Sequence, residues 1–425
     1  MGFLEIGLIV IGLMVLSMVA QERLKIPMPV TLISVVLLFA VFGYHIEMKG
    51  STFDSMLMLL LPLLISSDVL NLKPDELKKN WLSVVLTAGV VVVASVVLGV
   101  LLKAYILTHY DLSIPAMVAL MAMVVATDPV TVSAVFSNFR LPHHLKFIAE
   151  SESLFNDASA FVIFGIALTM LAQPMTADEV LVFSVVTIIM SFLVGLVVGV
   201  VGILLLKLSN GAQTETAIIL LVAYLSFEFA EYFEVAAIFS LVVSMVVMNA
   251  AILSEDSRLN IHANRPGLRH KLFSHLNDTY QNHPSIVQFL GFAALLANVL
   301  LYISIGEIID LYCLLGYWKE ILAVFVATSL IRALMMWRFK NTSHRIESME
   351  TISFDWWVVL TFAGVKGGLS ILMVHMLPET FAYKDLFTAI ILGNIILTTF
   401  VYSLLLTVYV KMRKVSFSLK SGCEG

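Results

Sequence analysis

The chain has 425 residues, of which 60% are hydrophobic and only 13% are charged. Soluble globular proteins carry about 25% charged residues, so this composition excludes an ordinary soluble domain. Apolar runs of about 20 residues, long enough to cross a bilayer, recur along the whole chain and predict an all-α polytopic membrane protein. The net charge of −5 says little, because the distribution of charge matters more in such proteins. Membrane lipid is an expected partner and nucleic acid is not.

Prolines, glycines and charge clusters divide the sequence into about thirteen predicted spans. Their limits in chain order are 3–20, 28–46, 53–72, 81–107, 113–138, 144–171, 179–207, 214–231, 235–253, 285–309, 317–339, 354–377 and 386–411. Together they form a single transmembrane domain over residues 1–425. Its expected parts are a first repeat at 1–172 (spans one to six), a linking span at 173–213, a second repeat at 214–412 (spans eight to thirteen) and a short cytoplasmic tail at 413–425.

The basic residues indicate how the spans are oriented. Most of the 25 lysines and arginines fall in the connections of one face and in the C-terminal tail. The opposite face holds only Lys49, Lys103, Lys319 and Lys384. Because Lys and Arg concentrate on the cytoplasmic side of a membrane, we expect the N-terminus outside and the C-terminus in the cytoplasm.

The one long connection, at residues 254–284, is predicted to be cytoplasmic. It contains His262, His270, His275 and His283. Its simplest interpretation is a solvated loop. The alternative is a regulatory element that senses pH, since histidine titrates near physiological pH.

Two spans are interrupted. In the fifth span, Pro129 removes a backbone donor and follows Thr127 and Asp128. In the twelfth, Lys366 stands at membrane depth among three glycines in Gly364-Val365-Lys366-Gly367-Gly368. Broken backbone in a membrane is tolerated where it lines a site or is buried in protein. Interrupted spans at matching positions of two halves predict an inverted-repeat transporter with two crossing helices and a site near the midplane.

The charges at these breaks have a predicted electrostatic role. Asp128 and Lys366 would help to neutralise the dipoles of the half-helices that face them. For Lys366, the alternative is an interfacial residue whose ammonium reaches the membrane surface.

The sixth span holds the candidate ion-binding residues. Ser153 and Asp157 are four residues apart, as are Glu152 and Asn156, so each pair shares a helix face. Hard cations such as Na⁺ prefer oxygen ligands. Burial disfavours the charged form of a carboxylate, so one buried aspartate can hold either a proton or a cation. We assign this role to Asp157.

Two further charged residues require explanation. Arg332 lies in an apolar helix and cannot readily lose its proton, so it needs a partner, for which Glu152 is the best candidate. The pair is expected to be structural, because a fixed arginine stops a carboxylate from cycling. Asp68, near Ser66 and Ser67, either lines an access path for ions or caps its helix.

These motifs resemble the monovalent cation:proton antiporter-1 family, the bacterial and archaeal sodium/proton antiporters related to animal sodium/proton exchangers. The main match is Glu152-Ser153-Leu154-Phe155-Asn156-Asp157, close to the family's Gly-Glu-Ser-Leu-Phe-Asn-Asp, with Thr127-Asp128-Pro129 about thirty residues earlier. Supporting matches are Leu61-Pro62-Leu63-Leu64, Ala297-Asn298-Val299-Leu300-Leu301-Tyr302 and Arg332.

The resemblance implies a homodimer of thirteen-helix subunits with an inverted repeat. It implies that Asp157 binds the cation or proton, aided by Asp128, Thr127 and Ser153. It further implies an ion bridge between Glu152 and Arg332 beside Asn156, and electroneutral one-for-one exchange.

This sequence departs from the family pattern at three places. Ser151 replaces the glycine before Glu152, and Lys366 stands where arginine is usual, which keeps the charge but loses the guanidinium fork. In span three, Ser66-Ser67-Asp68 stands about where the family has Phe-Glu.

We therefore expect a non-enzymatic antiporter of the inner cell membrane that exchanges Na⁺ or Li⁺ for H⁺ without a cofactor. A K⁺/H⁺ antiporter remains open, because the sequence does not show the dimensions of the cavity. An electrogenic antiporter would need a second carboxylate at Asn156, and a carrier of organic solutes would need a larger aromatic-lined pocket. An intramembrane aspartyl protease built on Asp128 and Asp157 is a remote alternative, since Asp128 is followed by a proline and Asp157 does not stand in a Gly-x-Gly-Asp context. A channel is disfavoured because no filter-like repeat occurs.

Overall fold

The computed structural model describes residues 3–24, 26–42, 51–136, 141–209, 211–254, 277–308, 311–347 and 349–413. These residues form helices joined by short connections, and no strand occurs among them. Helices satisfy their own backbone hydrogen bonds, which hydrocarbon surroundings require of a spanning segment. The predicted all-α class is confirmed.

The chain divides into two compact units. The first comprises Met1–Asp54, Asn80–Pro174 and Asn298–Gly425, and the second comprises Ser55–Lys79 and Met175–Ala297. Two helices contribute residues to both units, namely α3 (Ser51–Asn71) and α16 (Asn277–Ile308). The predicted repeats at 1–172 and 214–412 are a different division of the chain and stay a prediction.

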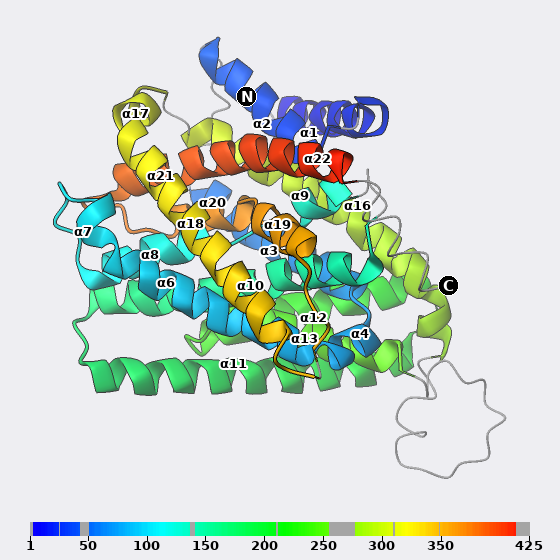
Figure 1. Cartoon of the computed structure of the whole chain (residues 1–425). Coiled ribbons are helices and arrows are strands. Elements are labelled where there is room, and N and C mark those ends of the chain that lie inside the picture. The colour runs from blue at the N-terminus through cyan, green and yellow to red at the C-terminus, as the bar shows by residue number, and fades with distance from the viewer. Residues whose placement is uncertain are drawn as a thin grey trace. The chain divides into compact units, whose positions relative to one another are not determined.

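The first unit contains the helices that carry most of the predicted site. They are α1 (Phe3–Val19), α2 (Met28–Val41), α5 (Trp81–Val85), α6 (Val92–Leu101), α7 (Lys103–Ile106), α8 (Ile114–Val125), α9 (Pro129–Phe136), α10 (His143–Ala172), α17 (Leu311–Gly316), α18 (Trp318–Ser343), α19 (Phe354–Phe362), α20 (Gly368–His375), α21 (Lys384–Leu397) and α22 (Ser403–Met412). In Figure 1, α18 runs obliquely across α6, against which it packs. The apolar stretch of α10 packs on α8.

Both predicted interruptions are present. Residues 126–128 are non-helical between α8 and α9, and residues 363–367 are non-helical between α19 and α20. Each broken pair starts with a serine cap, in which the Ser113 side chain accepts from the Ala116 amide and the Ser353 side chain from the Trp356 amide. The breaks therefore lie inside otherwise well-defined helical segments.

The second unit is a stack of helices. Besides the shared helices it holds α4 (Pro74–Lys79), α11 (Ala177–Leu205), α12 (Ala212–Tyr232) and α13 (Ala237–Ile252). α11 and α13 run side by side in Figure 1 and pack closely. Asn249 of α13 donates to the Val69 and Leu72 carbonyls at 2.9 and 2.8 Å, which satisfies the end of α3.

The lengths of the helices suit a multi-pass membrane protein. Among the described residues, eight helical segments are long and apolar enough to cross a bilayer, and four shorter apolar helices accompany them. Helices lie on every predicted span. The exact number of crossings and the orientation of the termini stay predictions.

One predicted boundary is wrong. The sequence places residues up to 284 in a connection, but α16 begins at Asn277 and continues through Pro284. Thr279 and Asn282 donate to the buried Glu215 carboxylate at 2.8 and 3.0 Å. These bonds hold the first turns of α16, the stretch that precedes Pro284. His283 thus lies in α16, whereas His262, His270 and His275 lie outside the described residues, as does the tail beyond Arg413.

Candidate functional site

Thr127 is the centre of the candidate ion site. Its hydroxyl accepts from Ser153 Oγ at 2.9 Å and from Asn156 Nδ2 at 3.0 Å, and its amide donates to Asp157 Oδ1 at 2.9 Å. The amide is free to do so because the backbone at 126–128 is not helical. The spacing within α10 places the three partners along the stretch that faces the break. The structure thus brings together four of the residues singled out from the sequence.

The end of α8 receives two donors. Asn156 Nδ2 lies 3.0 Å from the Val125 carbonyl oxygen, and Lys366 Nζ lies 3.3 Å from the same oxygen. A helix C-terminus carries partial negative charge on its unpaired carbonyls, so a buried ammonium is stabilising there. Lys366 is only 6% exposed, which is inconsistent with the alternative of an interfacial lysine.

Asp128 links the two interruptions. Its amide donates to the Val365 carbonyl at 2.8 Å, so the break in α8–α9 contacts the break in α19–α20 directly. A Cβ added to Gly367 would lie 2.4 Å from the Asp128 Cβ, so only glycine allows this approach. The Asp128 carboxylate precedes α9 and accepts from the Tyr302 hydroxyl at 2.9 Å. A negative charge at this end of α9 is favourable.

Glu152 and Arg332 form a two-point ion pair. Arg332 Nη1 and Nη2 donate to Glu152 Oε1 and Oε2 at 3.2 and 2.9 Å. Arg332 also donates to the carbonyls of Leu360 and Thr361, near the end of α19. Charge-assisted bonds of this geometry are the strong ones. The partner expected for Arg332 is present, and the guanidinium additionally satisfies the end of a half-helix.

A small cavity of about 30 Å³ lies beside these groups. Its lining includes Glu152, Asn156, Arg332 and Lys366. A cavity needs about 10–15 Å³ to hold one water molecule. There is room for water next to the ion pair, and not for an organic solute.

The carboxylates of this region differ in how exposed they are. Glu152 is 2% exposed and Asp128 is 7% exposed, whereas Asp157 is only partly buried. Its neighbours Thr127 and Ser153 are buried. Carboxylate, hydroxyl and carbonyl oxygens of this kind suit a hard cation. Asp157 therefore combines oxygen-rich surroundings with a partly exposed side chain.

Several contributors were not assigned a role from the sequence. The sequence shows Tyr302 only as part of a motif, yet its hydroxyl donates to the Asp128 carboxylate. Ser370 donates to the Met123 carbonyl at 2.8 Å, and Thr398 accepts from the Lys366 amide at 3.1 Å. An isolated polar residue in an apolar span was the available signal. Asp68 lies on α3 in the second unit and is half-buried, and its part in an access path stays a prediction.

Comparison with known proteins gives consistent relatives. The model of a family described as "Sodium/hydrogen exchanger, transmembrane" matches residues 8–412. The Na⁺/H⁺ antiporter ApNhaP of Aphanothece halophytica is 26% identical over 411 residues, covering 95% of this chain and 72% of the relative. The Na⁺/H⁺ antiporter NhaH of Halobacillus dabanensis is 26% identical over 337 residues, covering 77% of this chain and 75% of the relative.

A solved structure shares the fold. The sodium proton antiporter MjNhaP1 from Methanocaldococcus jannaschii matches with a TM-score of 0.73 and 17% sequence identity, covering 95% of this chain and 100% of that one. At this identity the likeness concerns the fold alone.

Proposed function

The chain belongs to the sodium/hydrogen exchanger family, and from this premise we propose that it is a secondary antiporter exchanging Na⁺ or Li⁺ for H⁺ across the membrane. The family is one of transporters, so the remote alternative of an intramembrane aspartyl protease is set aside. The transported ions are the substrates, and no cofactor is needed.

One observation carries the mechanism: Asp157 is partly exposed and bonded to an unwound backbone amide. Its carboxylate binds a cation when deprotonated and loses the cation when protonated, so each ion displaces the other. Thr127 and Ser153 supply neutral oxygens beside it, and Asp128 holds the break in place through Val365 and Tyr302. Alternating access of this one site to the two sides of the membrane would couple the two fluxes.

Three further charged side chains lie beside the site and have no part in the proposed exchange. Glu152 is committed to Arg332, and the Lys366 ammonium lies against the Val125 carbonyl. Asn156 is neutral and donates to Thr127 and Val125, so it cannot carry a second proton. This arrangement supports electroneutral exchange of one cation for one proton.

Related proposals concern the setting of the transporter. We expect a homodimer in the inner cell membrane with its N-terminus outside and its C-terminus in the cytoplasm. A K⁺/H⁺ antiporter on the same architecture is the second candidate, because K⁺ also takes oxygen ligands.

The test is exchange in proteoliposomes that contain a pH-sensitive dye. Na⁺, Li⁺ and K⁺ are added in turn to vesicles with an imposed pH gradient. We expect Na⁺ and Li⁺ to dissipate the gradient and K⁺ to have little effect. A response to K⁺ alone would replace the sodium assignment, and no response to any cation would contradict antiport.

A further inference from the structure

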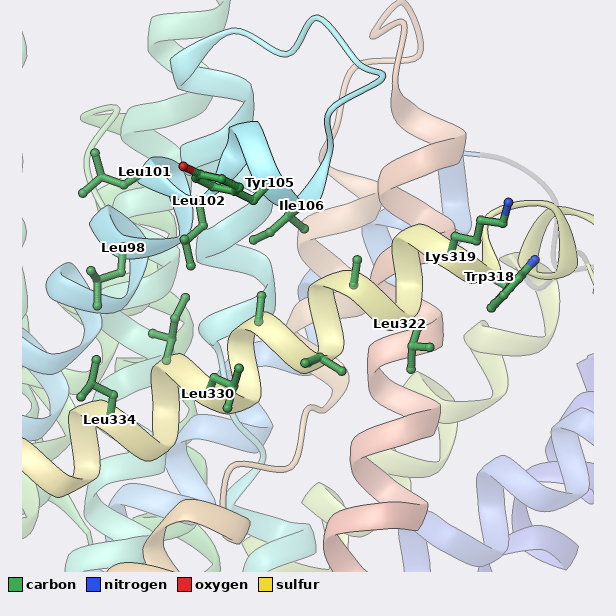
Figure 2. Close-up of a pocket in the computed structure, with 14 residues that line it drawn as sticks. Leu98, Leu101, Leu102, Tyr105, Ile106, Trp318, Lys319, Leu322, Leu330 and Leu334 are labelled. Carbon is green, nitrogen blue, oxygen red and sulfur yellow. The ribbon is translucent and has the colours of Figure 1, made fainter.

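A second pocket lies on the first unit, and its lining contains none of the residues that hold the ion site. It is a groove of about 740 Å³, within the 300–1,000 Å³ typical of ligand pockets. One wall runs along α18 from Trp318 to Leu334, and the other along α6 and α7 from Leu98 to Ile106 (Figure 2). α18 packs against both α6 and α7, so the walls are held together by their own contacts.

The lining is apolar along most of the groove. Ala323 and Ala327 are four residues apart on α18 and leave space between larger neighbours. Leu101 and Leu330 are 68% and 66% exposed. In a membrane-spanning chain, side chains exposed in this way face hydrocarbon. The groove is therefore open to the lipid phase along its length.

One end of the groove differs from the other. Figure 2 shows Leu98 and Leu334 toward one end and Trp318 and Lys319 toward the opposite end. Among the described residues that line the groove, Lys319 alone is charged, and its Nζ lies 5.8 Å from the Trp318 ring centroid. Trp and Lys are typical of the level at which lipid headgroups meet the hydrocarbon. The groove thus leads from a cationic interfacial end into an apolar interior.

We propose that this groove binds one anionic phospholipid, with an acyl chain along Ala323 and Ala327 and the phosphate beside the Lys319 ammonium. The pattern of one positive charge followed by a long apolar trough matches a molecule with an anionic head and a hydrocarbon tail. The neighbouring carboxylate of Glu320 accepts from the Tyr110 hydroxyl at 3.1 Å, so a partner for that acid is already present. The bilayer itself supplies the occupant.

The position of the groove gives the bound lipid a defined neighbour. Ile331 lines both this groove and the small cavity beside Glu152 and Arg332. Ile331 is only 5% exposed, so it forms a thin wall between the two spaces. A lipid in the groove would support that wall and the helix that carries Arg332.

The test is native mass spectrometry of the purified full chain in detergent. Phosphatidylglycerol and phosphatidylcholine with identical acyl chains are titrated separately. One interfacial lysine contributes about 1 kcal/mol toward an anionic lipid, so we expect about fivefold tighter retention of one phosphatidylglycerol. Lys319→Gln should remove this preference and leave phosphatidylcholine retention unchanged. Lys384→Gln, on the same predicted side, should keep it. Equal retention of both lipids by the unmodified chain would overturn the proposal.

A second variant tests whether the apolar part of the groove holds the acyl chain. Ala327→Trp fills the groove, so we expect it to abolish retention of both lipids. Lys319→Gln should abolish only the preference for phosphatidylglycerol over phosphatidylcholine. If Ala327→Trp instead shifts the chain from dimer to monomer and leaves lipid retention intact, the occupant is a second copy of the chain and the lipid proposal is wrong. Lys319→Gln changes an interfacial side chain only, so its result decides the headgroup contact even if the tryptophan variant does not fold.

Discussion

Two carboxylates five residues apart on α10 have opposite surroundings. Glu152 is 2% exposed and takes two bonds from the Arg332 guanidinium, whereas Asp157 is partly exposed and takes its bond from the Thr127 amide. The first carboxylate is held by a two-point ion pair, whereas the second accepts from a backbone amide and interacts electrostatically with the Lys366 ammonium. A carboxylate whose two oxygens are bonded to a guanidinium is poorly placed to exchange a cation for a proton, because the guanidinium stabilises its deprotonated form. The contrast supports our proposal that Glu152 is structural and that Asp157 carries the exchange.

The largest expected effect is at Asp157, the carboxylate proposed to carry the exchange. Asp157→Asn removes the only charge that the mechanism allows to change, so we predict complete loss of Na⁺/H⁺ exchange in proteoliposomes with an unchanged melting temperature. Asp178→Asn, an exposed change in the first turn of α11, is the matched control and should exchange normally. Persistent exchange in the Asp157 variant would remove this residue from its role.

Breaking the ion pair between Glu152 and Arg332 should instead lower the melting temperature. Arg332→Ala leaves Glu152 charged and buried, which typically costs about 3–5 kcal/mol, so thermal unfolding in detergent should shift far downward. Arg338 lies exposed on the same helix. Arg338→Ala is therefore the control and should leave the melting temperature unchanged.

A double variant sharpens this result. Glu152→Gln combined with Arg332→Met removes both charges, and we expect it to be more stable than Arg332→Ala alone. Equal melting temperatures for Arg332→Ala and the unmodified chain would contradict the ion pair.

Asn156 lies between Glu152 and Asp157 on α10, and changing it tests the ratio of cations to protons exchanged. Asn156→Asp introduces a second titratable group beside Thr127, so exchange should begin to move net charge and respond to an imposed membrane potential. It also loses donors to Val125 and Thr127, which costs about 1–3 kcal/mol. Currents recorded on solid-supported membranes distinguish electroneutral exchange from exchange that moves net charge. Sustained charge movement by the unmodified chain would defeat the one-for-one proposal.

The smallest expected effect concerns Tyr302. Tyr302→Phe deletes one hydrogen bond to the buried Asp128 carboxylate, a loss of about 1.5–3 kcal/mol. The free energy of unfolding should fall by that amount, and exchange should slow without disappearing. Tyr232→Phe removes an exposed hydroxyl and is the control. A stability equal to that of the unmodified chain would show that the Tyr302 bond contributes nothing.

Much of this contrast could be predicted from the sequence. Pro129 and the glycines around Lys366 indicated both helix breaks, because proline and glycine act on the backbone locally. The spacing of four residues between Ser153 and Asp157 placed them on one face, since helical geometry is regular. The partnership of Arg332 with Glu152 followed from the high cost of burying either charge alone.

Other features depended on packing that no local pattern records. The first turns of α16 bond to Glu215, more than sixty residues earlier in the chain. The bond from Tyr302 to Asp128 joins residues 174 positions apart. The contact between the two breaks requires Gly367 to meet Asp128, and the sequence shows only that both positions are unusual.

The most direct test of the central claim is the pH dependence of Na⁺ transport kinetics in proteoliposomes. If Na⁺ and H⁺ compete for Asp157, lowering the pH should raise the apparent KM for Na⁺, by about tenfold per pH unit where the protonated form dominates, and saturating Na⁺ should restore the same maximal rate. A KM that stays constant while the maximal rate falls would show that protons act elsewhere and would contradict competition at a single aspartate.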